Sequence, residues 1–195
     1  MRARRRAHFA SDPRWFCEQY RALAERSAAH NLRAARAPPP HAVALLMKFS
    51  EFRANQVLEA GPYLVTESEI LAFARAYDRQ WFHTDTQAAA KGRFAGLIAS
   101  GWHTCAIAMR LITDTALQGS ESFASPGVAY VKWPQPVRPG DHLWLRATVI
   151  ETRCARSQPT LGILRWRWRL FNAGDEEVLD LEATSLFDLS QSCAP

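Results

Sequence analysis

The order of the secondary-structure signals in this 195-residue chain predicts an α+β fold, with one antiparallel sheet and one long central helix. Helical patterns come first, between residues 66 and 112, and segments of alternating apolar and polar residues follow from residue 127 onward. Turn signals separate the later segments, as in an antiparallel sheet. The length is enough for one domain with a proper core.

Several short elements are predicted before the long helix. Thr66 is followed three residues later by Glu69, which is the spacing of a capping box, and an apolar helical period continues from there. Asp85 is the expected cap of a short helix, because its carboxylate can accept backbone N–H groups. The predicted elements are a strand at residues 62–65, a helix at 67–77, a turn at 78–85 and a short helix at 86–91.

The longest helical pattern begins near residue 98. Apolar residues recur there at steps of four, three, four and three, which marks the apolar face of one helix. Ser100 is expected in the N-terminal cap region, and His103 and Thr104 at polar helix positions. The predicted apolar stripe consists of Ile98, Trp102, Cys105, Met109 and Ile112.

Alternation with a period of two identifies the later strands. Trp166 and Trp168 fall on one side of the pattern and are expected in the core, whereas three arginines on the other side are expected on a solvated or interfacial face. Because one sheet around one helix leaves apolar surface uncovered, we expect a homodimer or a higher homo-oligomer. The strands are predicted at residues 127–133, 142–152, 162–171 and 178–187.

The basic charge of the chain is concentrated at its start. The net charge is +5 at pH 7, yet residues 1–46 hold nine arginines against three acidic residues, a net of +6, so residues 47–195 carry −1. Nucleic acid is therefore not an expected partner of the body. We interpret residues 1–46 as an Arg- and Pro-rich extension, either disordered or an over-extended start, with a targeting segment or a helical appendage as alternatives. Residues 47–195 form the predicted domain.

The cysteines do not form a metal-binding pattern. The four of them stand far apart without a CxxC pair, so a zinc site is not expected, and we predict no metal or organic cofactor. A reduced, cytoplasmic setting is the expected location. No apolar run approaches the roughly 20 residues that span a bilayer, so no membrane partner is expected.

Two segments carry the candidate chemistry. Asp78 and His83 lie five residues apart in a turn, and a carboxylate with an imidazole can act as a general acid and base. Gly101 opens the long helix after Ser100, and a backbone N–H at a helix N-terminus can stabilise negative charge that develops on an oxygen. Ser100 is not favoured as a nucleophile, since the sequence places no base for it.

Two motifs in this chain resemble those of the MaoC-like hydratases, which include the (R)-specific enoyl-CoA hydratases of the hot-dog fold. The family pattern Asp-x-Asn-Pro-x-His-x-Asp reads DRQWFHTD at residues 78–85, with Gly101 at the matching helix start. The later pattern Pro-Val-x-Pro-Gly-Asp is complete at residues 136–141. The chain departs from the family at Gln80, where Asn is usual, and at Trp81, where Pro usually stiffens the turn.

The resemblance covers roughly residues 49–188 and implies a single hot-dog domain, with an antiparallel sheet wrapped around the long helix. It implies hydration or dehydration of an enoyl-CoA or 3-hydroxyacyl-CoA thioester. Asp78 and His83 would hold the reacting water on one side of the alkene. The backbone N–H of Gly101 would meet the thioester oxygen, and Ser100 beside it would be a second residue of this oxyanion and substrate-binding site.

Two other functions are available to the same fold. A hot-dog acyl-CoA thioesterase would need a carboxylate on the central helix, where only Asp114 stands, far from the N-terminal end. A catalytically silent acyl-CoA-binding protein would result if Trp81 disturbs the turn that aims Asp78 and His83.

Overall fold

The computed structural model describes residues 47–191, so the predictions about residues 1–46 lie outside the described part of the chain. One sheet holds the strands in the order β1-β3-β4-β5-β2, and every pairing is antiparallel. The elements are, in chain order, η1 (Phe49–Glu51), β1 (Val57–Leu64), α2 (Glu67–Tyr77), α3 (Trp81–Thr84), α4 (Thr86–Ala90), α5 (Gly101–Ile112), the π-helical turn η2 (Thr113–Leu117), β2 (Ser122–Lys132), β3 (His142–Ala155), β4 (Gln158–Phe171) and β5 (Glu177–Asp188).

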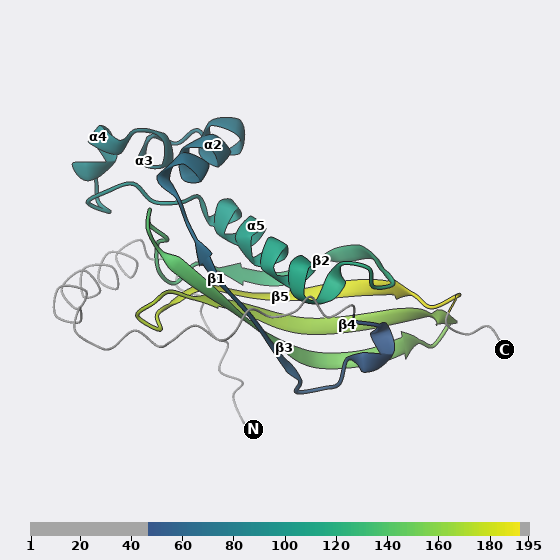
Figure 1. Ribbon diagram of the computed structural model, residues 1–195. Helices are drawn as coiled ribbons and strands as arrows, with labels where there is room; N and C mark the ends of the chain where they lie inside the picture. The colour runs from purple at the N-terminus through teal and green to yellow at the C-terminus, as the bar shows by residue number, and fades with distance from the viewer. Residues whose placement is uncertain (1–46, 192–195) are drawn as a thin grey trace, which may run out of the picture. The chain divides into compact units, whose positions relative to one another are not determined.

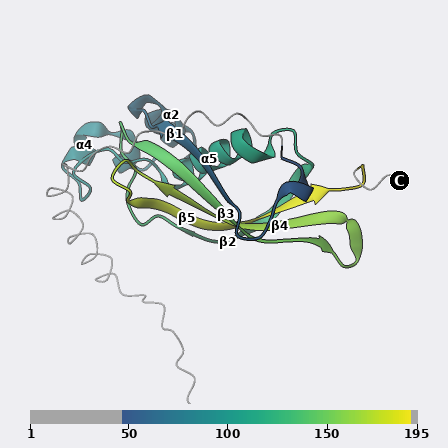
Figure 2. The ribbon, with the colours of Figure 1, turned by 60° about the horizontal axis from the view of Figure 1, so that its bottom comes forward.

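The helix α5 lies along one face of the sheet and contacts β1, β3, β4 and β5 (Figures 1 and 2). The short helices α2, α3 and α4 gather beyond the N-terminal end of α5 (Figure 1). This arrangement confirms the predicted α+β class and the hot-dog fold, in which one sheet wraps a central helix. No helix within residues 47–191 is long and apolar enough to cross a membrane.

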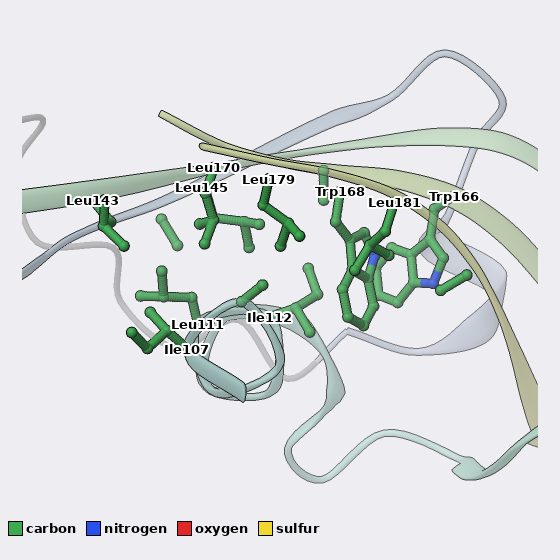
Figure 3. Close-up of a cluster of buried hydrophobic side chains, with 14 of the residues drawn as sticks. Ile107, Leu111, Ile112, Leu143, Leu145, Trp166, Trp168, Leu170, Leu179 and Leu181 are labelled. Carbon is green, nitrogen blue, oxygen red and sulfur yellow. The ribbon is translucent and has the colours of Figure 1, made fainter. Parts of the chain in front are cut away.

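The core lies between α5 and the sheet (Figure 3). Trp166 is fully buried, and its Nε1 donates to the Ser185 hydroxyl at 3.2 Å, which satisfies its polar atom. Trp168 packs edge-on against Trp166, with ring centroids 5.3 Å apart, so the prediction that both belong to the core is confirmed. The other labelled core residues are Ile107, Leu111 and Ile112 from α5, and Leu143, Leu145, Leu170, Leu179 and Leu181 from the strands.

The buried face of α5 differs from the predicted stripe. Ile98 precedes the helix, which begins at Gly101, and Trp102 and Met109 are 61% and 46% exposed. The prediction is correct for Ile112 and wrong for Trp102 and Met109. Its period was counted from a residue outside the helix, and the buried stripe starts with two residues that were expected at polar positions. The buried residues of α5 are His103, Thr104, Ile107, Ala108, Leu111 and Ile112.

The strands β1 and β2 form the two edges of the sheet, so each has one side without a strand partner in the described part of the chain. On β2, Phe123 and Val128 are exposed. Trp133 follows directly, and its ring meets that of Trp102 at the start of α5, with centroids 5.6 Å apart. Exposed apolar side chains therefore follow β2 to the first turn of α5.

The predicted arginine row lies on the face of the sheet away from α5 and is paired with carboxylates. Arg165 Nη2 lies 2.6 Å from Glu182 Oε1, and Arg167 Nε lies 2.7 Å from Asp180 Oδ1. The third arginine, Arg169, lies with its Nη1 3.6 Å from Oε2 of Glu177 on β5. Because neighbouring acids balance the row, it is a solvated ion-pair face rather than a surface that attracts phosphates.

Candidate active site

The helix α2 delivers Asp78 to the candidate site. The helix begins after Thr66, whose Oγ1 accepts the Glu69 N–H at 3.3 Å while Glu69 Oε2 accepts the Thr66 N–H at 3.2 Å. This confirms the predicted capping box. The helix ends at Tyr77, and the N–H of Asp78 still donates to the Ala74 carbonyl at 2.9 Å. The Asp78 side chain therefore leaves from a fixed helix end.

Both carboxylate oxygens of Asp78 accept hydrogen bonds. The Ser100 hydroxyl donates to Oδ2 at 2.7 Å, and the Gln80 side-chain amide donates to Oδ1 at 2.9 Å. The Ser100 hydrogen bond is the main reason that the pKa of Asp78 is lowered, with help from Gln80 and the nearby His83 and against the effect of partial burial. The carboxylate is therefore held in its charged form. Gln80, which replaces the usual Asn, keeps an amide donor in contact with it.

His83 lies on the short helix α3 and is only 5% exposed. Its Nδ1 is 2.8 Å from the carbonyl oxygen of Ile98. A carbonyl only accepts, so Nδ1 carries the hydrogen in this contact, and Nε2 of the neutral ring holds the free lone pair. Nε2 lies 3.5 Å from Oδ2 of Asp78. The predicted acid/base pair is therefore brought together, with the imidazole turned in a defined direction.

The two facing atoms of this pair are both hydrogen-bond acceptors when the imidazole is neutral. They lie close enough for one O–H-bearing molecule to donate to each of them, and they cannot satisfy each other without a proton. Asp78 also has a bound donor on the same oxygen from Ser100, which fixes the direction of its remaining lone pair. The arrangement is suited to holding a single water or hydroxyl group and moving one of its protons.

Ser100 and Gly101 form the start of α5. The Ser100 hydroxyl accepts the Trp102 N–H at 3.3 Å, so Ser100 is the N-cap, as predicted. The same hydroxyl donates its hydrogen to Asp78, so it accepts from the helix start and donates to the carboxylate at the same time. The backbone N–H of Gly101 has no acceptor among residues 47–191, as is usual for the first residue of a helix. This N–H lies one residue from the serine that holds Asp78.

The side of Gly101 that lacks a side chain is covered by the indole ring of Trp133. A Cβ on Gly101 would lie 2.5–2.9 Å from three atoms of that ring, which is closer than Cβ atoms approach their neighbours. Glycine at this position was expected to let a substrate carbonyl approach the backbone. In the structure, the group that approaches the Cα of Gly101 is the indole ring of Trp133. The N–H of Gly101 is not engaged by this contact.

Replacing Gly101 by alanine is expected to displace Trp133. Because the new methyl group overlaps the ring, we expect the free energy of unfolding to fall by about 1–3 kcal/mol, measured by urea denaturation. In a Trp133→Ala background the same substitution should cost little, since the overlapping ring is gone. Equal losses in the two backgrounds would show that overlap with the indole is not the reason for the glycine.

The second sequence motif holds the loop that precedes α5. The Ala99 N–H donates to the Val137 carbonyl at 2.8 Å, and the Arg138 guanidinium donates to the Phe94 carbonyl at 2.7 Å. The carbonyl of Ile98, which accepts from His83, lies between these two anchored points. The two motifs are therefore connected: the second positions a backbone group that orients the imidazole of the first.

Trp81 leaves the geometry of the pair intact. It is the first residue of α3, a helix position that proline also favours, so an ordinary residue can replace proline there without breaking the helix. Its half-exposed ring packs on Gly92, where a Cβ would lie 2.5 Å from the ring. Nearby, Asp85 accepts the N–H groups of Gln87 and Ala88, which confirms it as the cap of α4.

Two contacts that fix the pair were missed from the sequence. Ser100 was predicted as a cap and as a substrate-binding residue, but the hydrogen bond from its hydroxyl to Asp78 was not predicted. The Ile98 carbonyl has no side-chain signature by which it could be found. Within residues 47–191 no group of three or more His, Cys, Asp and Glu side chains is arranged to hold a metal ion.

Comparisons with known proteins agree with this fold. Residues 50–163 match a family model described as MaoC like domain. The uncharacterized protein YdeM of Bacillus subtilis (strain 168) is 32% identical over 140 residues, which covers 72% of this chain and 98% of YdeM. The crystal structure of the MaoC-like dehydratase from Rhodospirillum rubrum is 32% identical with a TM-score of 0.66, over 71% of this chain and 94% of that one.

A relative with a named activity is 3-hydroxyacyl-thioester dehydratase Z of Mycobacterium tuberculosis (strain ATCC 25618 / H37Rv), which is 36% identical over 86 residues. That match covers 43% of this chain and 56% of the dehydratase. The fold and the site thus define a hot-dog protein with a carboxylate and an imidazole at the head of its central helix. The chain belongs to the MaoC-like domain family, as its two motifs predicted.

Proposed function

We propose that this protein hydrates an enoyl-CoA thioester, or dehydrates the corresponding 3-hydroxyacyl-CoA, without a metal or organic cofactor. The observation that carries the proposal is the 3.5 Å separation of His83 Nε2 and Asp78 Oδ2 beside the start of α5. A water molecule can donate one hydrogen to each of these atoms, and the hydroxyl of a 3-hydroxyacyl group can donate its single hydrogen to one of them. The family match and the relatives named as dehydratases support this reaction class.

In the hydration direction, the bound water adds its oxygen to C3 of the alkene. One water proton passes to Nε2 of His83, and the same proton is returned to C2, so the pair ends in its starting state. The charged Asp78 orients the water and stabilises the imidazolium while it exists. Because one pair serves both carbons from one side, we expect syn addition. Dehydration follows the same steps in reverse.

The N–H of Gly101 would stabilise the enolate that forms between the two steps. Negative charge moves from C2 onto the thioester oxygen, and a donor fixed at a helix N-terminus meets it without reorganisation. One such donor is typically worth about 3–4 kcal/mol in the transition state. The amide lies next to Ser100, so the charge-stabilising group and the Asp78 carboxylate are fixed by consecutive residues.

A thioesterase mechanism is less well supported by the central helix. The residues of α5 include no Asp or Glu that could activate water against the thioester carbonyl. Asp114 follows in η2, where it is exposed and lies 3.9 Å from Arg110. The silent alternative requires a damaged site, and the contacts of Asp78 and His83 are complete although Trp81 replaces proline.

Purified protein and crotonyl-CoA test the proposed function directly. Hydration removes the conjugated alkene, so the absorbance of the enoyl thioester should fall while no free thiol is released. Release of free thiol would support the thioesterase instead, because hydrolysis of the thioester frees coenzyme A and leaves the alkene in the released acid. If neither change occurs with enoyl-CoAs of several chain lengths, the proposal is wrong and the protein is a catalytically silent member of the fold.

Ser100→Ala is expected to move the acid limb of the pH profile. The Ser100 hydrogen bond is the main cause of the lowered pKa of Asp78, so its loss should raise that pKa. If ionised Asp78 is needed, the fall of kcat/KM on acidification begins at higher pH in the variant. Near neutral pH the carboxylate stays charged and the change in rate is smaller. An unmoved acid limb would contradict the role given to Asp78.

We also propose that the protein is a homodimer that pairs through the open edge of β2. Of the two edge strands, β2 is longer than β1, and its exposed Phe123 and Val128 are continuous with the apolar rings of Trp133 and Trp102. An edge of this kind can pair with a second copy of itself. The site at the head of α5 would then lie close to the subunit interface.

Val128→Lys is expected to convert the dimer into a monomer. A lysine on the proposed interface places like charges opposite each other across the two-fold axis, which disfavours self-pairing. Val57→Lys is the matched control, because Val57 is similarly exposed on the other edge strand. The molar mass of each variant by light scattering gives the result. A dimer that survives Val128→Lys and dissociates in Val57→Lys would place the interface on β1.

A further inference from the structure

A second group of titratable side chains lies between β1, α2 and α5. His103 Nε2 is 3.4 Å from Glu69 Oε1, and the Tyr63 hydroxyl donates to the same oxygen at 2.8 Å. The imidazole of His103 stacks on Phe73, with ring centroids 4.8 Å apart and planes 12° from parallel. The Arg110 guanidinium covers the Tyr63 ring. None of these side chains takes part in the proposed reaction.

The protonation of His103 follows from its surroundings. The residue is 6% exposed, and its buried Nδ1 has no partner within residues 47–191. An unpartnered buried N–H costs more than an unpartnered lone pair in a neutral ring, so the hydrogen belongs on Nε2, which faces the Glu69 carboxylate. Burial also lowers the pKa of His103, in agreement with a neutral ring. His103 is thus a neutral ring whose Nε2 faces a charged carboxylate 3.4 Å away.

His103 joins α2, which ends just before Asp78, to α5, whose N-cap is Ser100. It lies in the first turn of α5, three residues after Ser100, and its two partners Glu69 and Phe73 lie on α2. The end of α2 supplies Asp78, and the cap of α5 supplies the hydroxyl that binds Asp78 at 2.7 Å. The relative position of the two helices therefore sets the length of the Ser100–Asp78 hydrogen bond.

We propose that His103 is a positioning residue for Asp78, which it serves by docking α2 against α5 through Glu69 and Phe73. It is not a catalytic residue, because both of its contacts are with side chains of α2: Nε2 faces Glu69, and the ring stacks on Phe73. Its effect on turnover rests on the proposed hydratase function. Its effect on the Asp78 carboxylate does not, and can be measured without substrate.

The test is the titration of Asp78 in the full chain, followed by carboxyl-carbon NMR in the absence of substrate. His103→Leu keeps an apolar side chain in the buried position but removes the donor to Glu69. The Ser100–Asp78 hydrogen bond should lengthen, and the midpoint of the Asp78 titration should rise by about 0.5 pH unit. In hydration assays, kcat should fall about tenfold with KM within about twofold, and the acid limb should move with the titration.

Matched variants separate positioning from general packing. His103→Gln places an amide donor where Nε2 lies and should restore the titration midpoint and kcat to within about threefold of the original protein. Tyr63→Phe removes the other donor to the same Glu69 oxygen but keeps His103 and its stacking on Phe73, and it should leave Asp78 unchanged. The groups that face Asp78 directly, namely Ser100, Gln80 and His83, are the same in all these variants.

If His103→Leu lowers thermal stability but leaves the Asp78 titration unchanged, His103 is a packing residue only. If the leucine variant does not fold, His103→Asn replaces it, because the shorter amide stays polar but cannot reach Glu69, and the same titration decides. If the protein has no hydratase activity but His103→Leu still shifts the midpoint of the Asp78 titration, the positioning role stands and only the proposed function is refuted.

Discussion

Asp78→Asn is expected to lower kcat/KM for the hydration of crotonyl-CoA by about 10³ while the fold is unchanged. The amide has nearly the shape of the carboxylate, so the end of α2 can keep its conformation. It carries no charge, however, and it cannot accept at both positions where Ser100 and Gln80 now donate. The bound water loses an acceptor, and the imidazolium loses the charge that stabilises it. Steady-state kinetics and circular dichroism of the variant provide the measurement.

The matched control for this substitution is Asp85→Asn. Asp85 belongs to the same motif and is also an acid next to a short helix, but it serves as the cap of α4 by accepting the N–H groups of Gln87 and Ala88. Asn is itself a good N-cap, so this variant should retain activity within a few-fold. If the two variants lose activity equally, the loss reflects the conformation of the turn rather than the charge of Asp78.

Local structure was largely predictable from the sequence. The bounds of α2 agree with the prediction, because Thr66 and Glu69 close a capping box between residues only three apart. The role of Asp85 follows for the same reason. In such cases the side chain and its partner are neighbours in the chain, so spacing alone identifies the contact.

Contacts between distant residues were not predictable in this way. The Ser100–Asp78 bond joins residues 22 positions apart, and the contact of Trp133 with Gly101 joins a strand end to a helix start. The buried face of α5 was misassigned because His103 is polar, and its burial is explained by its contacts with Glu69 and Phe73 on α2. A sequence pattern identified which residues carry chemistry, but the packing of α2 on α5 decides how they meet.

His83→Gln is expected to lower kcat by about 10³ for a reason that differs from that for Asp78. The glutamine amide reaches the place of Nε2 and fills the space, yet it cannot take up a proton. His83→Asn tests the other half of the ring, because its amide lies near the place of Nδ1 and can still donate to the Ile98 carbonyl. We expect this variant to be equally slow. A turnover within tenfold of the original in either variant would exclude His83 as the base.

The double variant Asp78→Asn with His83→Gln decides whether the two side chains act on one molecule. If each contributed independently, the two losses would multiply to about 10⁶. If both hold the same water across the 3.5 Å between Oδ2 and Nε2, the first substitution already disrupts the arrangement that the second would remove. We therefore expect the double variant to be only a few-fold slower than either single variant, as measured by single-turnover kinetics at equal protein concentration. Multiplicative losses would separate the two residues into different steps and end the shared-water mechanism.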